Sequence, residues 1–150
     1  MGQSLAQVYL HLIFSTKDRR PYIDDKIEKD LFSYIGGIIK HQDGIPLCIN
    51  GTSNHIHILY SHPRTKSLFD FVKEIKGSSS KWVKMKGSDY KTFGWQDGYA
   101  AFSVSSSKKE IVEKYIMNQK GHHKKEEFRE ELLSFLDKYN LEYDETYLWR

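Results

Sequence analysis

The chain has 150 residues and a formal net charge of +3, and its 39% hydrophobic and 14% aromatic residues suffice for one buried core, so a single domain over residues 1–150 is expected. Cys48 is the only cysteine, which excludes an internal disulfide, and no run approaches the roughly 20 apolar residues of a transmembrane helix, which excludes a membrane role. The first residues also lack the basic start and apolar run of a signal peptide, so a cytoplasmic protein is expected.

The first quarter of the chain predicts a strand followed by a helix. Residues 7–15 are a β-branched and aromatic run of strand length, and the charged turn 16–21 ends it. From Asp24, a candidate N-cap, apolar residues recur at helical spacing as far as the break at Asp43 and Gly44.

A hairpin is predicted next. Residues 45–50 and 55–60 each have the length and composition of a short strand, and residues 51–54 between them favour a turn. Because the turn is short, the two strands should be antiparallel.

The middle of the chain predicts a second helix. Ser67 and Asp70 have the spacing of a capping box, and apolar residues follow at helical intervals. The small residues 77–80 are expected to bend this helix before Trp82.

The last third predicts one more strand and two helices. Residues 99–104 favour a fourth strand. Ser107 and Glu110 form a capping box that should open the next helix, and Gly121 stands where a C′ glycine would end it. An acidic amphipathic helix from about residue 124 to residue 139 closes the chain.

The order of these elements predicts an α+β fold. Strand, helix, strand, strand, helix, strand is the ferredoxin-like split β-α-β arrangement, an antiparallel sheet with helices on one face. Two helices, including the one from Ser107, are appended to it. Such a sheet hosts many unrelated functions, so the fold alone does not decide the chemistry.

Charge is sorted along the chain. Residues 64–91 hold eight basic and three acidic side chains, a balance of +5, whereas residues 126–145 hold two basic and eight acidic ones, a balance of −6. A basic middle segment fits a polyanionic partner, and an acidic tail should lie away from one. The alternative for the middle segment is a solvated, lysine-rich helix face.

The predicted strand at residues 55–60 carries a His-x-His pair. Side chains alternate along a strand, so His55 and His57 project from one face while Ile56 and Ile58 project from the other. Two imidazoles at this spacing can converge on one metal ion, although by themselves they are also typical of ordinary half-buried histidines.

The helix predicted after Ser107 offers two further candidates. Tyr115 and Gln119 are four residues apart and lie on one helical face, so the helix could present a nucleophile and a metal ligand together. The alternative is that Tyr115 packs in the core and Gln119 faces solvent. His11, His41 and His62 have no partner that the sequence reveals.

The pairing of these two motifs resembles the HUH single-strand nucleases, specifically the single-tyrosine transposases of small bacterial insertion sequences (the IS200-like family, in its branch associated with repetitive extragenic palindromes). One departure is Asn54, where the family pattern has Asp before the two histidines. The likeness runs along the whole chain in four segments, residues 11–21, 75–82, 95–105 and 115–123.

The resemblance implies a function and a catalytic site. Tyr115 would attack a phosphorus atom of single-stranded DNA, giving a covalent 5′-phosphotyrosine that can later be rejoined. His55, His57 and Gln119 would bind a divalent metal ion. Imidazole ligands alone favour zinc-like metals, whereas the resemblance implies Mg²⁺ or Mn²⁺ because phosphate oxygens complete the shell.

The expected partners are single-stranded DNA and DNA hairpins, and the resemblance further implies a homodimer in which Tyr115 of one subunit often serves the histidines of the other. Two alternatives are a domesticated nuclease that processes genomic palindromes and a catalytically silent nucleic-acid-binding module on the same sheet. The side chains expected to contact DNA phosphates are Arg64, Lys73, Lys76 and Lys81.

Overall fold

The computed structural model describes residues 2–122 and 127–150. Four strands and six helices make up these ranges: β1 (Tyr9–Ser15), α1 (Glu28–His41), β2 (Ile45–Gly51), β3 (His55–Ser61), α2 (Leu68–Lys84), β4 (Ala100–Val104), α3 (Lys109–Met117), α4 (Gln119–His122), α5 (Phe128–Lys138) and α6 (Glu145–Leu148). In this part of the chain no helix is long and apolar enough to cross a membrane.

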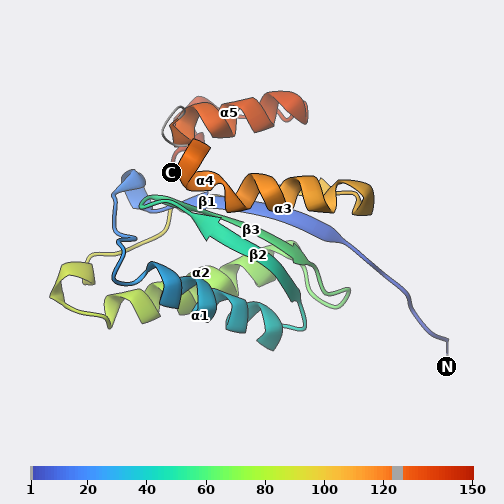
Figure 1. Ribbon diagram of the computed structural model, residues 1–150, viewed down its shortest axis with the longest axis horizontal. Helices are drawn as coiled ribbons and strands as arrows, with labels where there is room; N and C mark the ends of the chain where they lie inside the picture. Colours follow the sequence, from blue (N-terminus) through green and yellow to red (C-terminus); the bar gives the residue numbers. More distant parts are fainter. Residues whose placement is uncertain (1, 123–126) are drawn as a thin grey trace.

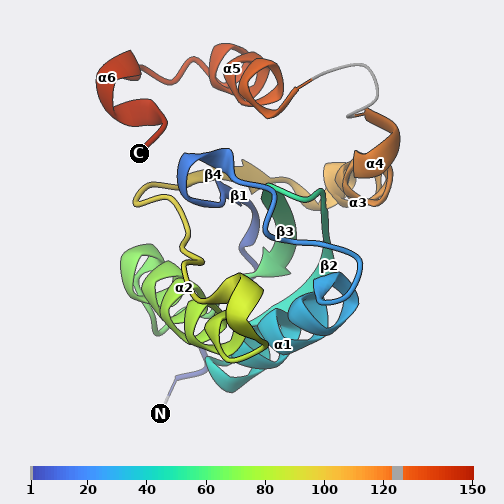
Figure 2. The same cartoon turned by 90° about the vertical axis from the view of Figure 1, so that its left-hand side faces the viewer.

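The strands form one antiparallel sheet in the order β2-β3-β1-β4 (Figures 1 and 2). This order confirms the predicted split β-α-β arrangement, because β1 lies between β3 and β4 and the hairpin partner β2 lies at the edge. In the central pair, Ile13 of β1 is opposite His57 of β3. The register therefore places residues near the start of the chain beside residues close to position 60.

Helices α1 and α2 cover one face of the sheet, as Figure 2 shows. The main apolar core fills this layer, and every second residue of each central strand enters it, including Leu12, Phe14, Ile56 and Ile58. Burial of these side chains, at roughly 25 cal/mol per Å², is the main source of the stability of the sheet.

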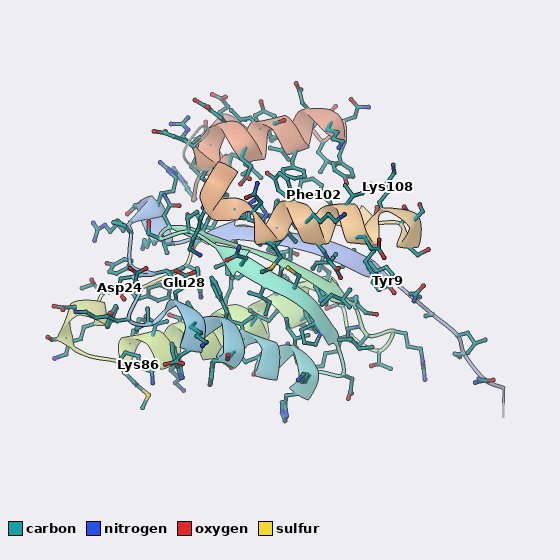
Figure 3. The ribbon with its side chains drawn as sticks, viewed as in Figure 1. Tyr9, Asp24, Glu28, Lys86, Phe102 and Lys108 are labelled. Carbon is teal, nitrogen blue, oxygen red and sulfur yellow. The ribbon has the colours of Figure 1, made fainter. Side chains whose placement is uncertain are left out.

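Helices α3 and α5 lie over the opposite face (Figures 1 and 2). Here Ile13 and Phe102 pack against apolar side chains of α5, and Leu59 packs against Ile116 of α3. Figure 3 shows Phe102 of β4 on the side of the sheet that faces these helices. The second face is thus closed at its ends by small apolar clusters, and polar side chains lie between them.

The predicted start of α2 is confirmed. Ser67 is the N-cap, and its hydroxyl accepts a hydrogen bond from the backbone N–H of Asp70 at 3.0 Å. The predicted bend is absent, since α2 is one helix of 17 residues through the small segment 77–80. Ser79 fits within it because its hydroxyl donates to the carbonyl of Ile75, one turn earlier.

The predicted limits of the α3 helix were wrong. Its N-cap is Lys108, without a side-chain cap, because residues 106–108 form a 3₁₀ turn in which Ser107 is already included. Its C-cap is Asn118, and Gly121 belongs to the separate helix α4. The acidic helix α5 begins at Phe128, and the start predicted near residue 124 lies outside the described residues.

Candidate functional site

The two histidines of β3 project from the face under α3 and α5, which confirms the predicted alternation. His55 and His57 are both fully buried, and their ring centroids are 5.2 Å apart. The hairpin turn brings β2 close to His55, and a Cβ at Gly51 would clash with the His55 carbonyl oxygen. A glycine is therefore required where β2 ends.

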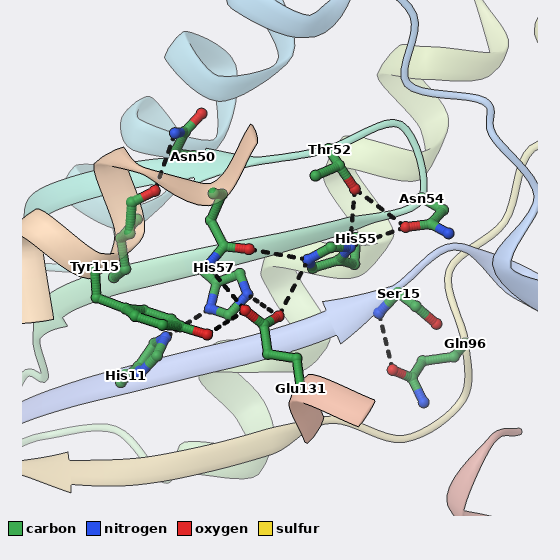
Figure 4. A network of polar contacts seen from close by, with 12 residues as sticks. His11, Ser15, Asn50, Thr52, Asn54, His55, His57, Gln96, Tyr115 and Glu131 are labelled. Carbon is green, nitrogen blue, oxygen red and sulfur yellow. Dashed lines mark hydrogen bonds and ion pairs between the residues drawn. The ribbon is translucent and has the colours of Figure 1, made fainter. Parts of the chain in front are cut away.

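The end of α3 brings Tyr115 and Gln119 to these histidines. Asn50 of β2 donates to the carbonyls of Ile116 and Met117 at 3.0 and 3.2 Å, which anchors the helix end over the sheet (Figure 4). Gln119 is fully buried, with its Oε1 3.2 Å from Nε2 of His55, and the Tyr115 ring centroid is 5.9 Å from that of His57. The structure thus brings together all four residues that the resemblance implied.

A fifth residue, Glu131 of α5, lies at the centre of this cluster (Figure 4). Its Oε1 is 2.9 Å from Nε2 of His57 and 3.4 Å from Nε2 of His55. Its Oε2 accepts a hydrogen bond from the amide of Gln119 at 3.0 Å and another from the hydroxyl of Tyr115. Glu131 therefore joins both histidines, the amide and the tyrosine.

Sequence reasoning missed Glu131. It was counted with the acidic tail, which was expected to lie away from a polyanionic partner, and the structure places it in the histidine cluster. A signal was present, because Glu131 falls at i+3 from Phe128 and directly before Leu132, on the face of α5 that is buried. A carboxylate within an apolar helical stripe indicates a buried polar contact.

The donor set of this cluster fits a divalent metal ion. One ligand atom from each of His55, His57 and Glu131 lies within 4.8 Å of the others, and all three residues are buried. A buried carboxylate is costly unless a positive charge compensates it, and a bound cation supplies that charge. The Oε1 of Gln119 faces the same centre and adds an oxygen ligand.

The outer nitrogens of both imidazoles are held by hydrogen-bond partners. Nδ1 of His55 is 2.9 Å from Oδ1 of Asn54 and 3.0 Å from Oγ1 of Thr52, so Asn54 supplies a side-chain oxygen where the family pattern has Asp. Nδ1 of His57 is 2.8 Å from Nε2 of His11. The pKa of His11 is well below its usual value, chiefly because of burial and also because of His57, with Glu131 acting in the opposite direction.

The basic side chains predicted to contact DNA lie elsewhere. Arg64, Lys73 and Lys81 are exposed on α2 or in the loop before it. Figure 2 shows α2 on the face of the sheet opposite to α3, the helix that carries Tyr115. The structure therefore does not bring them to the histidine cluster, and their contact with DNA stays a prediction.

Lys76 is engaged within the protein. It is half-buried, and its ammonium donates to the carbonyls of Gln96, Asp97 and Gly98, to the first two at 2.8 and 3.1 Å. Burial lowers the pKa of Lys76 to about 8. This side chain anchors the loop before β4, and the DNA contact predicted for it would require it to leave these carbonyls.

Comparison with known proteins agrees with this fold. The family model of IS200-like transposases matches residues 4–119. The ISDra2 transposase TnpA of Deinococcus radiodurans is 26% identical over 118 residues, which cover 75% of this chain and 84% of that protein.

Two solved structures share the fold. A transposase from Deinococcus radiodurans R1 has a TM-score of 0.62 at 22% identity, covering 79% of this chain and 96% of that one. A REP-associated tyrosine transposase bound to a REP hairpin has a TM-score of 0.60 at 13% identity, covering 82% of this chain and 74% of that one.

The protein is thus an α+β domain with a split β-α-β sheet. More specifically, the chain belongs to the IS200-like transposases, a family of enzymes that catalyse DNA transposition. The family match ends at Gln119, so Glu131 lies beyond the matched residues.

Proposed function

We propose that this protein cleaves and rejoins single-stranded DNA through a 5′-phosphotyrosine at Tyr115, with a divalent metal ion, Mg²⁺ or Mn²⁺, in the histidine cluster. One observation carries the proposal: Tyr115, His55, His57, Gln119 and Glu131 form a single connected network within one chain. A nucleophile, two imidazoles and two oxygen ligands in contact are the groups that this chemistry needs.

The metal ion would be held by His55, His57, Glu131 and Gln119. When bound, it supplies a Lewis acid for the scissile phosphate and a template that fixes the strand beside the nucleophile. The buried Glu131 carboxylate lowers the net charge of the loaded site, and the amide of Gln119 is fixed by its hydrogen bond to that carboxylate. The resident side chains thus pre-form the ligand set.

Tyr115 forms the covalent bond. Free tyrosine has a pKa of ~10, so the phenol is a weak nucleophile that must be held in place. Glu131 accepts the hydrogen bond of the Tyr115 hydroxyl and so keeps its oxygen at the cluster. The phenol loses its proton as its oxygen bonds to phosphorus, the bond between phosphorus and the 3′-oxygen breaks, and the 3′-oxygen takes up one proton and leaves as a hydroxyl. Attack by a 3′-hydroxyl reverses the step and joins the strand.

Space for the strand adjoins the tyrosine. A pocket of about 250 Å³ is lined by Tyr115, Glu131, His11 and Phe135 among others. A second pocket, of about 350 Å³, is lined by Asn54, which contacts His55, and by the arginines Arg19 and Arg129. Guanidinium groups in this pocket suit the phosphates that flank the cleaved one.

The exposed basic side chains on α2 and in the loop before it would fit a DNA molecule that extends beyond the cleaved strand. The helix α2 lies across the sheet from α3, which carries Tyr115. A DNA molecule that contacts both Tyr115 and the basic side chains Arg64, Lys73 and Lys81 must therefore pass around an edge of the sheet. A hairpin with an attached single strand meets this requirement. The REP-associated tyrosine transposase with the same fold is bound to a hairpin, which supports the same partner class here.

Formation of the covalent adduct tests the proposed function. The wild-type protein, incubated with Mn²⁺ and a pool of labelled hairpins that carry single-stranded flanks, should give a band that survives denaturing electrophoresis. Tyr115→Phe should abolish it, whereas Tyr139→Phe, which alters a second tyrosine of the same pocket, should retain it. An adduct with Tyr115→Phe would refute the nucleophile, and DNA binding without any adduct would instead support the silent binding module.

The same adduct shows whether the two subunits of the expected homodimer share an active site. The structure favours a site built within one chain, since the Tyr115 hydroxyl donates to Glu131 of its own chain. Mixing Tyr115→Phe with a His55→Ala, His57→Ala double variant should therefore restore no adduct. Recovery of the adduct after subunit exchange would show that tyrosine and histidines are shared between subunits.

A further inference from the structure

His11 contacts the proposed metal site from behind. It lies on β1, two residues from Ile13, which is opposite His57 in the register, so both imidazoles project from the same face of the sheet. His11 is 2% exposed, and its Nε2 is 2.8 Å from Nδ1 of His57. Figure 4 shows the two rings joined on the side of His57 away from His55.

The chemistry of a metal-bound imidazole decides what this contact does. His57 directs Nε2 at the cluster, so Nε2 must be unprotonated to bind a cation, and the ring proton then resides on Nδ1. In a buried site that N–H needs an acceptor. Nε2 of His11 is in place to accept it, provided that His11 carries its own proton on Nδ1. The tautomers of the two rings are therefore set together.

We propose that His11 is a positioning residue, which fixes the tautomer and the orientation of His57 as a metal ligand. This inference rests on the metal site proposed above. Outer partners of this kind hold a ligand ring in place and typically contribute a factor of about 10 to 100 in metal affinity. His55 has the corresponding support from Asn54 and Thr52, so each ligand imidazole has a dedicated partner at its outer nitrogen.

The ring of His11 is itself well fixed. Phe135 of α5 packs edge-on against it with ring centroids 5.3 Å apart, and the rings of Phe102 and Tyr115 both lie at 6.4 Å. Aromatic contacts on several sides leave the imidazole few alternative orientations. His11 can therefore transmit a defined geometry to His57.

Metal affinity measured without DNA tests this role. The dissociation constant of Mn²⁺ is obtained from the electron paramagnetic resonance signal of the free ion. His11→Phe retains a ring but loses the acceptor, and it should weaken Mn²⁺ binding by about 10- to 100-fold. His11→Gln places Oε1 at the position of Nε2 and should stay within a few-fold of wild type. Phe102→Leu, which reduces the aromatic packing on His11 but keeps both imidazoles, serves as the packing control, and its loss of affinity should be smaller than that of His11→Phe.

Several results would overturn the inference. Unchanged affinity in His11→Phe would show that the contact is dispensable, and an equal loss in Phe102→Leu or in His11→Gln would show that packing alone matters. If urea unfolding shows that the metal-free Phe variant is not folded, His11→Met takes its place with the same expected loss. Absence of Mn²⁺ binding by the wild-type protein would instead refute the metal site itself, so the two failures are distinguishable.

Discussion

The two faces of the sheet bury side chains of opposite character, although they are made from the same strands. On β3, Ile56, Ile58 and Tyr60 enter the apolar core under α1 and α2. The intervening His55 and His57 enter a polar cluster under α3 and α5. Both sets are almost completely buried.

The difference shows how the protein separates stability from chemistry. Apolar burial stabilises the fold, whereas the polar face places two imidazoles, an amide and a carboxylate in a site where each needs a partner. Such a cluster gives little net stability and provides ligands at fixed positions. One face should therefore respond to substitution mainly through unfolding, and the other mainly through metal binding and catalysis.

Neighbouring residues of β3 give the largest contrast. Ile58→Ala should lower the free energy of unfolding by about 2 to 5 kcal/mol, because it leaves a cavity in the closed core. Ile58→Ala should leave Mn²⁺ binding by the folded protein within a few-fold of wild type, whereas His57→Ala should weaken it by at least about 100-fold, since a lost ligand exceeds the effect of a lost outer partner. Urea unfolding and Mn²⁺ titration of both variants measure the contrast. Unchanged Mn²⁺ affinity in folded His57→Ala would mean that His57 is structural.

Replacement of Glu131 should also act mainly through metal binding, with a smaller effect than replacement of His57. Mn²⁺ should raise the melting temperature of the wild-type protein, and a tenfold weaker affinity in Glu131→Gln should reduce this gain by about 1.4 kcal/mol, or about 4 °C for a domain of this size. Glu130→Gln, which alters the exposed neighbour, is the control and should keep the full gain. Thermal melts with and without Mn²⁺ provide the measurement. An undiminished gain in Glu131→Gln would remove this residue from the ligand set.

The smallest expected effects are those of lysine substitutions on α2 on DNA binding. Lys73→Ala and Lys81→Ala should each weaken single-stranded DNA binding a few-fold and reduce the slope of log K against log salt concentration by about 0.7, as expected for one lost phosphate contact. Lys76→Ala should leave this slope unchanged and lower the melting temperature, because it releases the loop before β4. Fluorescence anisotropy at several salt concentrations tests the three variants. Unchanged slopes for Lys73 and Lys81 would indicate a merely solvated helix face.

Much of the fold could be predicted from local pattern. The β-branched runs of β1 and β3, the short turn after Gly51 and the cap at Ser67 are determined by neighbouring residues, so their elements follow from the sequence. The start of α3 could not be predicted so well. Ser107 has the spacing of a capping box, but it is taken into the 3₁₀ turn after Ser105, which supplies the first turn instead.

Spacing predicted that His55 and His57 share one face of a strand and that Tyr115 and Gln119 share one face of a helix, because a strand has period two and a helix period 3.6. Their roles were implied only by the family resemblance. The structure places the four residues in one cluster. The role of Glu131 could not be predicted, since its place in the apolar stripe of α5 indicates a buried polar contact but does not identify a partner more than seventy positions away. Nor could that of His11, which meets His57 only through the register of β1 and β3.

The sequence by itself determined the order of elements and the alternation of the two faces of the sheet, because these depend on contacts within a few positions of the chain. The tertiary structure alone decided which groups complete the site and which lysines are far from it. Packing of α5 on the sheet places Glu131 between the imidazoles. The fold also brings the loop before β4 to the ammonium of Lys76, and it places α2, which carries Lys73, on the opposite face of the sheet. Such contacts depend on how whole elements pack, and that packing is a property of the assembled core.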